Sequence, residues 1–145
     1  MKHFFDHTFR PFFILTGIGT ALGGLAALWP RWTAEKVVLI PYDQDYTLIL
    51  QHWGFMLGLM GVFMIVAAFW TPWRKPILSF GVFEKAFLVY LVLTNVSRPY
   101  ARGLWFGAGM DATVVVYTVV YFGVCGFRTS SLRSDRVLQQ AKKAA

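Results

Sequence analysis

Long runs of apolar residues, separated by short polar stretches, dominate this 145-residue chain. Four runs are close to the ~20 residues that a helix needs to cross the ~30 Å hydrocarbon core of a bilayer. They cover residues 12–29, 48–70, 77–96 and 104–125. Tryptophans stand at or near the ends of these runs, where aromatic belts at membrane interfaces are expected. The pattern predicts an all-α protein with four transmembrane helices in one domain.

Composition supports the membrane class, because 57% of the residues are hydrophobic and 14% are charged. The net charge of +7 raises the question of nucleic acid. In a membrane protein, however, basic residues report topology first, and no nucleic-acid-binding motif accompanies them. The single cysteine, Cys125, allows no disulfide within the chain. We therefore expect the lipid bilayer as a partner and no nucleic acid.

The short connections between the runs predict antiparallel neighbours and an up-down-up-down four-helix bundle. Lys and Arg outside the helices are more frequent on the side that holds both termini. That side has Lys2, Arg10, Arg74, Lys75, Arg128, Arg133, Arg136, Lys142 and Lys143, whereas the other has Arg31, Lys36, Arg98 and Arg102. The positive-inside rule then places both termini in the cytoplasm. It predicts an external connection at 30–47, a basic cytoplasmic tail at 127–145 and, in a bacterium, the inner membrane. We expect residues 1–10 to lie at the interface.

Small residues at a spacing of four mark faces where membrane helices approach closely. Gly19 and Gly23 form one such pair, Gly54 and Gly58 continue to Gly61, and Gly103 and Gly107 form a third set. We interpret most of them as packing residues.

The strongest candidate for chemistry is a trio of charged residues inside the third and fourth runs. Glu84 and Lys85 are adjacent near the middle of 77–96, and Asp111 lies several residues inside 104–125. A charge at mid-bilayer costs at least ~2.5–3.5 kcal/mol, so it needs shelter from lipid. Helical spacing places Glu84, Leu88, Leu91 and Asn95 on one stripe, and Gly107, Asp111, Thr118 and Cys125 on another. We predict that these stripes face each other, either as a structural clasp or as a site for a proton, an ion or a ligand.

A second set of polar residues falls at the external end of the helices. Gln51 and His52 begin the second run, level with Asn95, and Arg98 and Arg102 follow the third run. Together they are candidates to line a pocket that opens outward and holds an anionic group. Alternatively, both arginines are interfacial residues whose head groups reach water.

Cofactor and enzyme signatures are weak. His52, Met56, Met60 and Met64 recur at a spacing of four, and such ligands suit copper(I), but the row drifts around the helix and cannot close on one metal. Haem would need axial ligands on facing helices, and only one histidine falls within the runs. The sequence has neither a nucleotide-binding glycine loop nor a nucleophile arrangement. We assign no catalytic residue, no metal site and no cofactor, and nothing requires an enzyme.

The whole-chain plan resembles the DoxX superfamily of small four-helix membrane proteins. The features that carry the resemblance are the glycine-rich first helix, the long first external connection and the acidic residues Glu84 and Asp111 in the third and fourth helices. It implies an accessory role, in some members beside a quinone-linked redox enzyme. The segment from His7 to Phe13 resembles the start of NnrS-type haem–copper membrane proteins, but the chain is too short for their many helices, so no cofactor is carried over.

Two functional hypotheses remain open. The first is an accessory or structural subunit of a larger membrane complex, with other subunits or further copies of itself as partners. The second is a binder or transporter of a small hydrophobic or weakly acidic ligand, with Glu84, Lys85 and Asp111 in its cavity.

Overall fold

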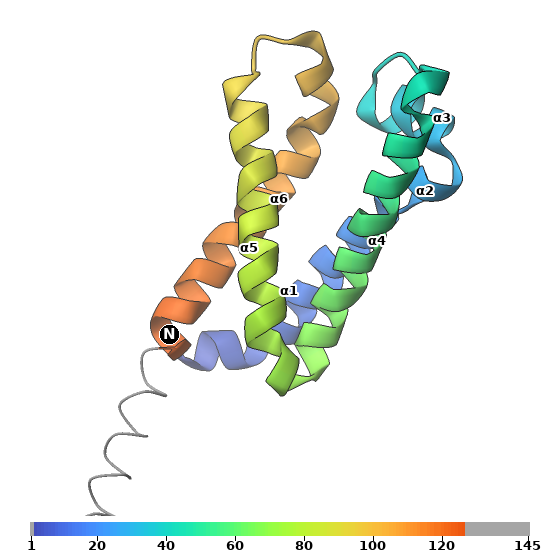
Figure 1. The fold of residues 1–145 in the computed structure, drawn as a ribbon. Helices are drawn as coiled ribbons and strands as arrows, with labels where there is room; N and C mark the ends of the chain where they lie inside the picture. The colour runs from blue at the N-terminus through green and yellow to red at the C-terminus, as the bar shows by residue number, and fades with distance from the viewer. Residues whose placement is uncertain (1, 127–145) are drawn as a thin grey trace, which may run out of the picture.

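The computed structural model describes residues 2–126, and every regular element in that range is helical (Figure 1). The all-α prediction is confirmed for these residues; the predicted basic tail at 127–145 lies outside them. The elements in chain order are α1 (Lys2–Leu22), α2 (Leu25–Leu28), α3 (Pro30–Trp32), η1 (Thr33–Val38), η2 (Gln44–Tyr46), α4 (Thr47–Phe69), α5 (Thr71–Thr94), η3 (Pro99–Leu104), α6 (Trp105–Tyr121) and η4 (Phe122–Gly126).

Four helical stretches within the described residues are long and apolar enough to cross a membrane: His3–Leu28, Gln44–Phe69, Thr71–Thr94 and Pro99–Cys125. They form a bundle, as predicted, and they indicate an integral membrane protein. A helix satisfies all its backbone hydrogen bonds internally, so apolar segments of this length adopt it in lipid.

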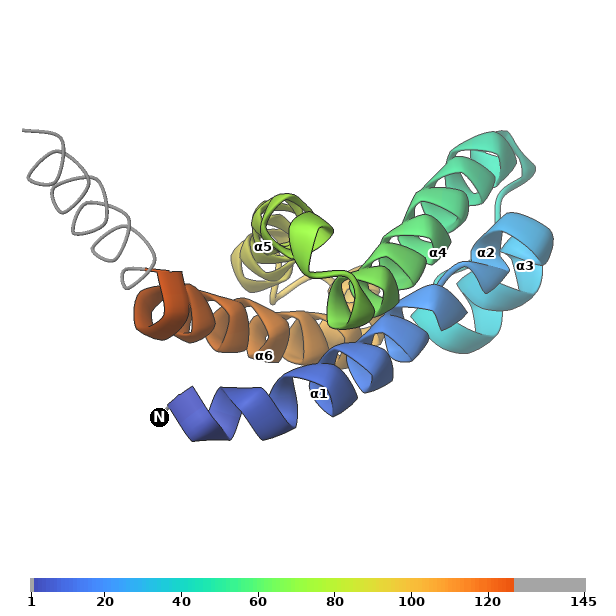
Figure 2. The ribbon, with the colours of Figure 1, turned by 90° about the horizontal axis from the view of Figure 1, so that it is seen from below.

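The bundle consists of two well-packed helix pairs. α1 packs along α4 and α5 packs along α6, while α4 also contacts α5 (Figures 1 and 2). A single extended residue, Trp70, joins α4 to α5, so the chain reverses direction within one residue. In Figure 1 this joint lies at the lower end, near the N-terminus, and η1 and η3 lie at the upper end.

Glycines bring α1 and α4 into contact, as their spacing predicted. A methyl group on Gly61 would come within 2.5 Å of the carbonyl oxygen of Gly17, and one on Gly58 would be 3.2 Å from Gly24 Cα. Gly107, in contrast, has no atom within 4 Å of its hypothetical Cβ. The predicted glycine contact therefore holds for α4 but does not extend to this position on α6.

Helix α1 begins at Lys2, well before the predicted start of the first run at residue 12, and the position of residues 1–10 at the interface stays a prediction. Phe5 and Phe9 are buried and pack their rings against Tyr121 of α6. Thr8 forms a 2.8 Å hydrogen bond with the Tyr117 hydroxyl, which ties the same turn of α1 to α6. These contacts extend the helix by more than two turns before the expected start.

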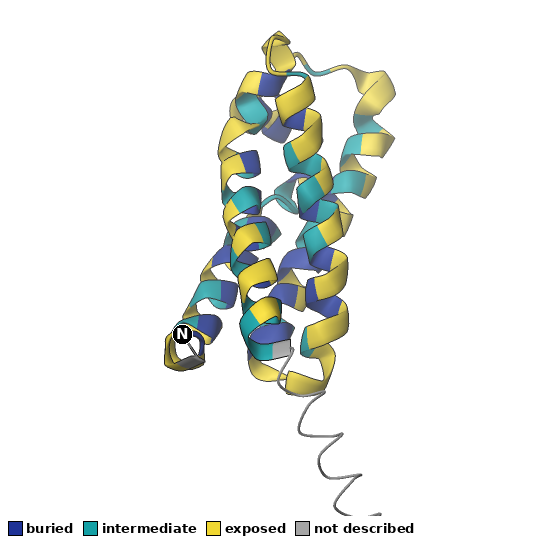
Figure 3. Ribbon diagram, turned by 90° about the vertical axis from the view of Figure 1, so that its left-hand side faces the viewer, coloured by how far each residue is buried: buried dark blue, intermediate teal, exposed yellow. Residues whose placement is uncertain are grey.

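The main apolar core draws on all four long helices and lies toward the α4–α5 joint. Its buried members are Phe9, Phe13, Met60, Met64, Ala67, Ala68, Ile77, Leu78 and Val114. Arg74 closes this end: its Nε donates to the Ala67 carbonyl at 3.1 Å, and its guanidinium lies 3.9 Å from the centre of the Phe9 ring. Figure 3 shows buried residues on the inner sides of the helices and exposed residues along their outer sides. Most of the helix surface is therefore available to lipid or to a partner.

The upper end is closed by the two connections. Gly103 of η3 lies directly against the backbone of Val38 in η1, and Ala34 and Ala101 are buried beside this contact. The connection between α1 and α4 is thus packed onto the one between α5 and α6.

Candidate functional site: a buried ion pair between α5 and α6

Lys85 and Asp111 form an ion pair inside the bundle. Lys85 Nζ donates to Asp111 Oδ1 at 2.6 Å, which is a short charge-assisted hydrogen bond. The two side chains are 1% and 4% exposed, so water is excluded from both. The pair joins the middle of α5 to the middle of α6.

The packing of α5 explains how a lysine reaches this position. One face of α5 carries the buried residues Leu78, Gly81, Lys85 and Val92. The end of the Met60 side chain of α4 lies against Gly81, one turn before Lys85, and would have to move to admit a side chain there. On α6, Ala108, Asp111, Val114 and Thr118 form the buried face. Two residues of the expected stripe, Asp111 and Thr118, belong to this buried face, whereas Gly107 and Cys125 are only half-buried.

The expected stripe of α5 is rotated relative to the observed one. Lys85, and not Glu84, points into the bundle, and Leu91 is exposed. Successive residues on a helix point about 100° apart, so burying Lys85 turns Glu84 toward the margin of the interface. The reason is the length of the lysine side chain, which lets its ammonium group reach Asp111 across the helix contact.

Glu84 lies beside the pair without completing it. Its Oε2 is 3.8 Å from Lys85 Nζ, and the side chain is 32% exposed. Oε2 itself is buried and accepts no hydrogen bond within residues 2–126. Two carboxylates thus share one ammonium group, and when all three are ionised the cluster carries one excess negative charge.

This arrangement has two chemical capacities. The Lys85–Asp111 bond can hold α5 and α6 together, because removing either partner would strand a charge in an apolar environment. Glu84 can take up a proton or associate with a positive charge, because its Oε2 has no hydrogen-bond donor within residues 2–126. A proton can satisfy the buried Oε2, whereas a donor from another helix can reach only the exposed part of the side chain.

The other predicted site residues lie elsewhere. Gln51 and His52 are exposed on α4, and Arg98 and Arg102 are exposed around η3. Asn95 is the C-cap of α5, and its side chain bonds residues close to it in the chain. Its Nδ2 donates to the Leu91 carbonyl at 2.9 Å, and its Oδ1 accepts from the Tyr100 hydroxyl at 3.1 Å. The structure therefore brings Glu84, Lys85 and Asp111 together and leaves Asn95 in a helix cap.

Possible metal ligands do not cluster. Within residues 2–126, His, Cys, Asp and Glu form no group of three that could hold a metal ion. The methionine row on α4 is divided, since Met60 and Met64 are buried in the core whereas Met56 is 46% exposed. These methionines serve packing at two of the three positions.

Three buried threonines, Thr20, Thr33 and Thr118, add unsatisfied polar groups to the described part of the chain. Thr16 and Thr113 bond the carbonyl four residues earlier, as helical threonines commonly do. The hydroxyls of Thr20 on α1 and Thr118 on α6 are buried, and within the described part of the chain they have no hydrogen-bond partner. Only Thr118 was anticipated from spacing, although Thr16, four residues before Thr20, was a signal for a polar position on the same face of α1.

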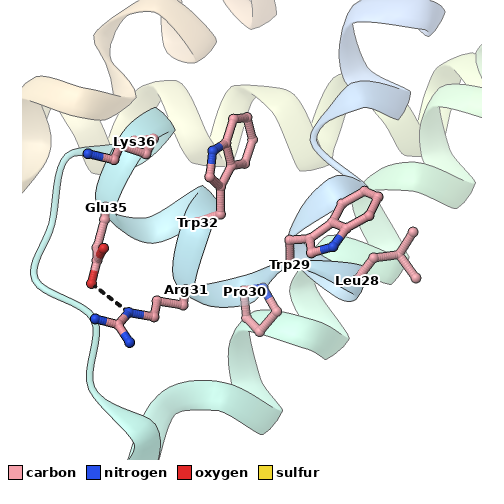
Figure 4. Close-up of a pocket in the computed structure, with 7 residues that line it drawn as sticks. All are labelled: Leu28, Trp29, Pro30, Arg31, Trp32, Glu35 and Lys36. Carbon is pink, nitrogen blue, oxygen red and sulfur yellow. Dashed lines mark hydrogen bonds and ion pairs between the residues drawn. The ribbon is translucent and has the colours of Figure 1, made fainter.

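A pocket of about 430 Å³ lies apart from the ion pair, where α2, α3 and η1 meet (Figure 4). We call it the tryptophan pocket. Its lining residues are Leu28, Trp29, Pro30, Arg31, Trp32, Glu35 and Lys36. Sequence reasoning missed it, although two tryptophans flanking an arginine at the end of an apolar run were the available signal.

No family model, curated protein or solved structure matches this chain. The fold and the site therefore define only a class: a small integral membrane protein, built as a helical bundle with a buried lysine–aspartate pair. The resemblance to DoxX proteins stays an expectation from the sequence.

Proposed function

We propose that this protein is an accessory or structural subunit of a larger membrane complex. The proposal includes an up-down-up-down arrangement in a bacterial inner membrane with both termini in the cytoplasm, as the distribution of Lys and Arg favours. A quinone-linked redox enzyme is the kind of partner that the DoxX resemblance implies. The observation that carries the proposal is the position of Glu84, at the margin of an exposed aromatic face.

That face, the outer face of α5, is defined by Phe80, Phe83, Phe87 and Tyr90. Their spacing of three and four places them on one side of the helix, and each is more than half exposed. A second helix can pack along such a face by van der Waals contact, which drives association within lipid. An isolated bundle would instead present this face, and Glu84 beside it, to hydrocarbon.

Glu84 supplies the polar part of the proposed contact. Its side chain is 32% exposed and lies in the middle of a 24-residue apolar helix, where a carboxylate is costly. A partner helix with a hydrogen-bond donor or a cationic side chain at this depth would satisfy it. A second copy packed through the same face would bring two Glu84 carboxylates together, so charge favours a different partner.

Site-specific photo-crosslinking in native membranes tests this. A photoreactive phenylalanine analogue at Phe83 should give one discrete heteromeric product, identified by mass spectrometry and present in stoichiometric amount. The same analogue at Leu15, which is 73% exposed on α1, is the matched control and should not give that product. Glu84→Leu should reduce the Phe83 product. A product that contains only this chain, or equal products from both positions, would refute the proposal.

The excess carboxylate also supports a second candidate, a binder or transporter of a weakly acidic ligand that is coupled to a proton at Glu84. In that case Glu84→Gln, which keeps the shape of the side chain, should abolish uptake and leave assembly intact. If Glu84→Gln leaves uptake unchanged, the second candidate fails.

A further inference from the structure

We propose that the tryptophan pocket binds the head group of an anionic phospholipid. The pocket is independent of the ion pair and of the proposed subunit role. It lies where the span His3–Leu28 ends and the chain continues as α3 and η1. It therefore occupies the boundary between apolar helix and polar connection.

The two sides of the pocket have different chemistry. In Figure 4, Leu28 and Trp29 lie on one side, and Arg31, Glu35 and Lys36 lie on the other. The indoles of Trp29 and Trp32 are more than half exposed, so neither is needed to fill the core. Amphipathic rings of this kind prefer the depth of lipid head groups. Lipid chains can thus lie against one side while a phosphate meets the other.

The backbone creates this division. Trp29 adopts φ −129° and ψ 66°, which interrupts the helix between α2 and α3. Pro30 then starts α3, and Thr33 N–H donates to the Trp29 carbonyl at 3.0 Å. The break separates Arg31, Glu35 and Lys36 from the apolar span, which ends at Leu28.

Charge selects the ligand. Arg31 and Lys36 are cationic and Glu35 is anionic, which leaves one net positive charge in the lining. Arg31 Nε donates to Glu35 Oε1 at 3.1 Å. Within residues 2–126, the terminal nitrogens of Arg31 and the Lys36 ammonium have no hydrogen-bond or ion-pair partner. A guanidinium fork and an ammonium group with free donors suit a phosphate.

Free phosphate offers the same head-group chemistry, but the adjoining tryptophans and the end of the span favour a lipid. An experiment must therefore separate these sources. The purified protein is incubated with an equimolar mixture of phosphatidylglycerol and phosphatidylcholine, and retained lipid is counted by native mass spectrometry. Glycerol phosphate, which has the head group without acyl chains, is the competitor.

The wild type should retain phosphatidylglycerol in preference to phosphatidylcholine. The double variant Arg31→Gln with Lys36→Gln should lower that retention by roughly fivefold for each charge removed. This factor corresponds to the attraction of one basic side chain to an anionic lipid surface. Arg98→Gln with Arg102→Gln removes the same charge from the other connection and should keep the preference. Glu35→Gln should increase retention, because it frees the whole Arg31 fork. All these side chains are exposed or half-exposed, so the variants should fold.

Each other outcome overturns the proposal. Equal loss in the two double variants would show diffuse attraction to the surface. Equal retention of the two lipids by the wild type would show that no anionic site exists. Displacement of phosphatidylglycerol by equimolar glycerol phosphate would assign the pocket to a soluble phosphate compound.

Discussion

Replacing Lys85 by methionine tests the central feature of the bundle. Methionine is also unbranched and of similar length, so it can fill the same space without the charge. Asp111 would then be 4% exposed and without the donor that lies 2.6 Å away in the wild type. Stranding one member of a buried pair typically costs about 3–5 kcal/mol. Because whole domains are stable by only about 5–15 kcal/mol, we expect a large loss of stability.

The double variant Lys85→Met with Asp111→Leu separates the cost of a stranded charge from the value of the pair. Apolar replacement of both partners is often neutral or stabilising by about 1–4 kcal/mol. We therefore expect the double variant to be more stable than Lys85→Met alone. This strong non-additivity is the signature of two residues in direct contact.

The free energy of unfolding can be measured in mixed micelles by titration with a denaturing detergent, with helical circular dichroism as the readout. Lys75→Met, which removes an exposed charge from the same helix, is the control and should change stability by less than about 0.5 kcal/mol. The reasoning is refuted if Lys85→Met matches Lys75→Met, or if the double variant loses the sum of the two single losses.

Further predictions concern the other helix contacts, each measured by the same unfolding titration. Gly61→Val should lower the free energy of unfolding by about 1–3 kcal/mol or more, because a side chain there meets the backbone of α1. Gly107→Ala should leave it unchanged, because nothing lies within 4 Å of a Cβ at that position. Equal effects of the two substitutions would contradict the α1–α4 contact. Tyr117→Phe should cost about 0.5–1.5 kcal/mol through loss of the hydrogen bond to Thr8, and exposed Tyr90→Phe should cost nothing measurable. Arg74→Gln should lower the free energy of unfolding by about 1.5–3 kcal/mol. Arg74→Lys should recover little of this loss, because an ammonium group cannot make all the guanidinium contacts to Ala67, Tyr121 and Phe9. Full recovery with lysine would show that only the charge matters.

The four helices could be predicted because a long apolar segment in lipid must satisfy its own backbone hydrogen bonds, and the α-helix does so. The rotation of α5 could not. Glu84 and Lys85 are adjacent, and either could have faced inward; the choice depends on the reach of Lys85 to Asp111 and on the contact of Met60 with Gly81. Only the three-dimensional packing of three helices determines that.

The start of α1 was missed for a related reason. His3, Asp6 and His7 lower the hydropathy of the first ten residues, which then resemble an interfacial segment. The spacing of Phe5 and Phe9 was a signal for a helix face. That face is buried only because it packs against Tyr121 of α6, more than a hundred residues away in the chain. Hydropathy reports the preference of a segment for lipid, and it does not report such long-range ring contacts.

The unequal roles of the two carboxylates bear on function. Asp111 alone gives the Lys85 ammonium a short hydrogen bond and a balancing charge, so a purely structural clasp has no need of Glu84. A clasp alone therefore predicts that Glu84→Leu leaves the isolated bundle unchanged or more stable, since it removes a poorly satisfied acid from an apolar span. If the same variant also weakens crosslinking from Phe83, then Glu84 acts outward, toward a partner. Stability and assembly would then respond to one substitution in opposite directions, which neither a structural residue nor an unused one can produce.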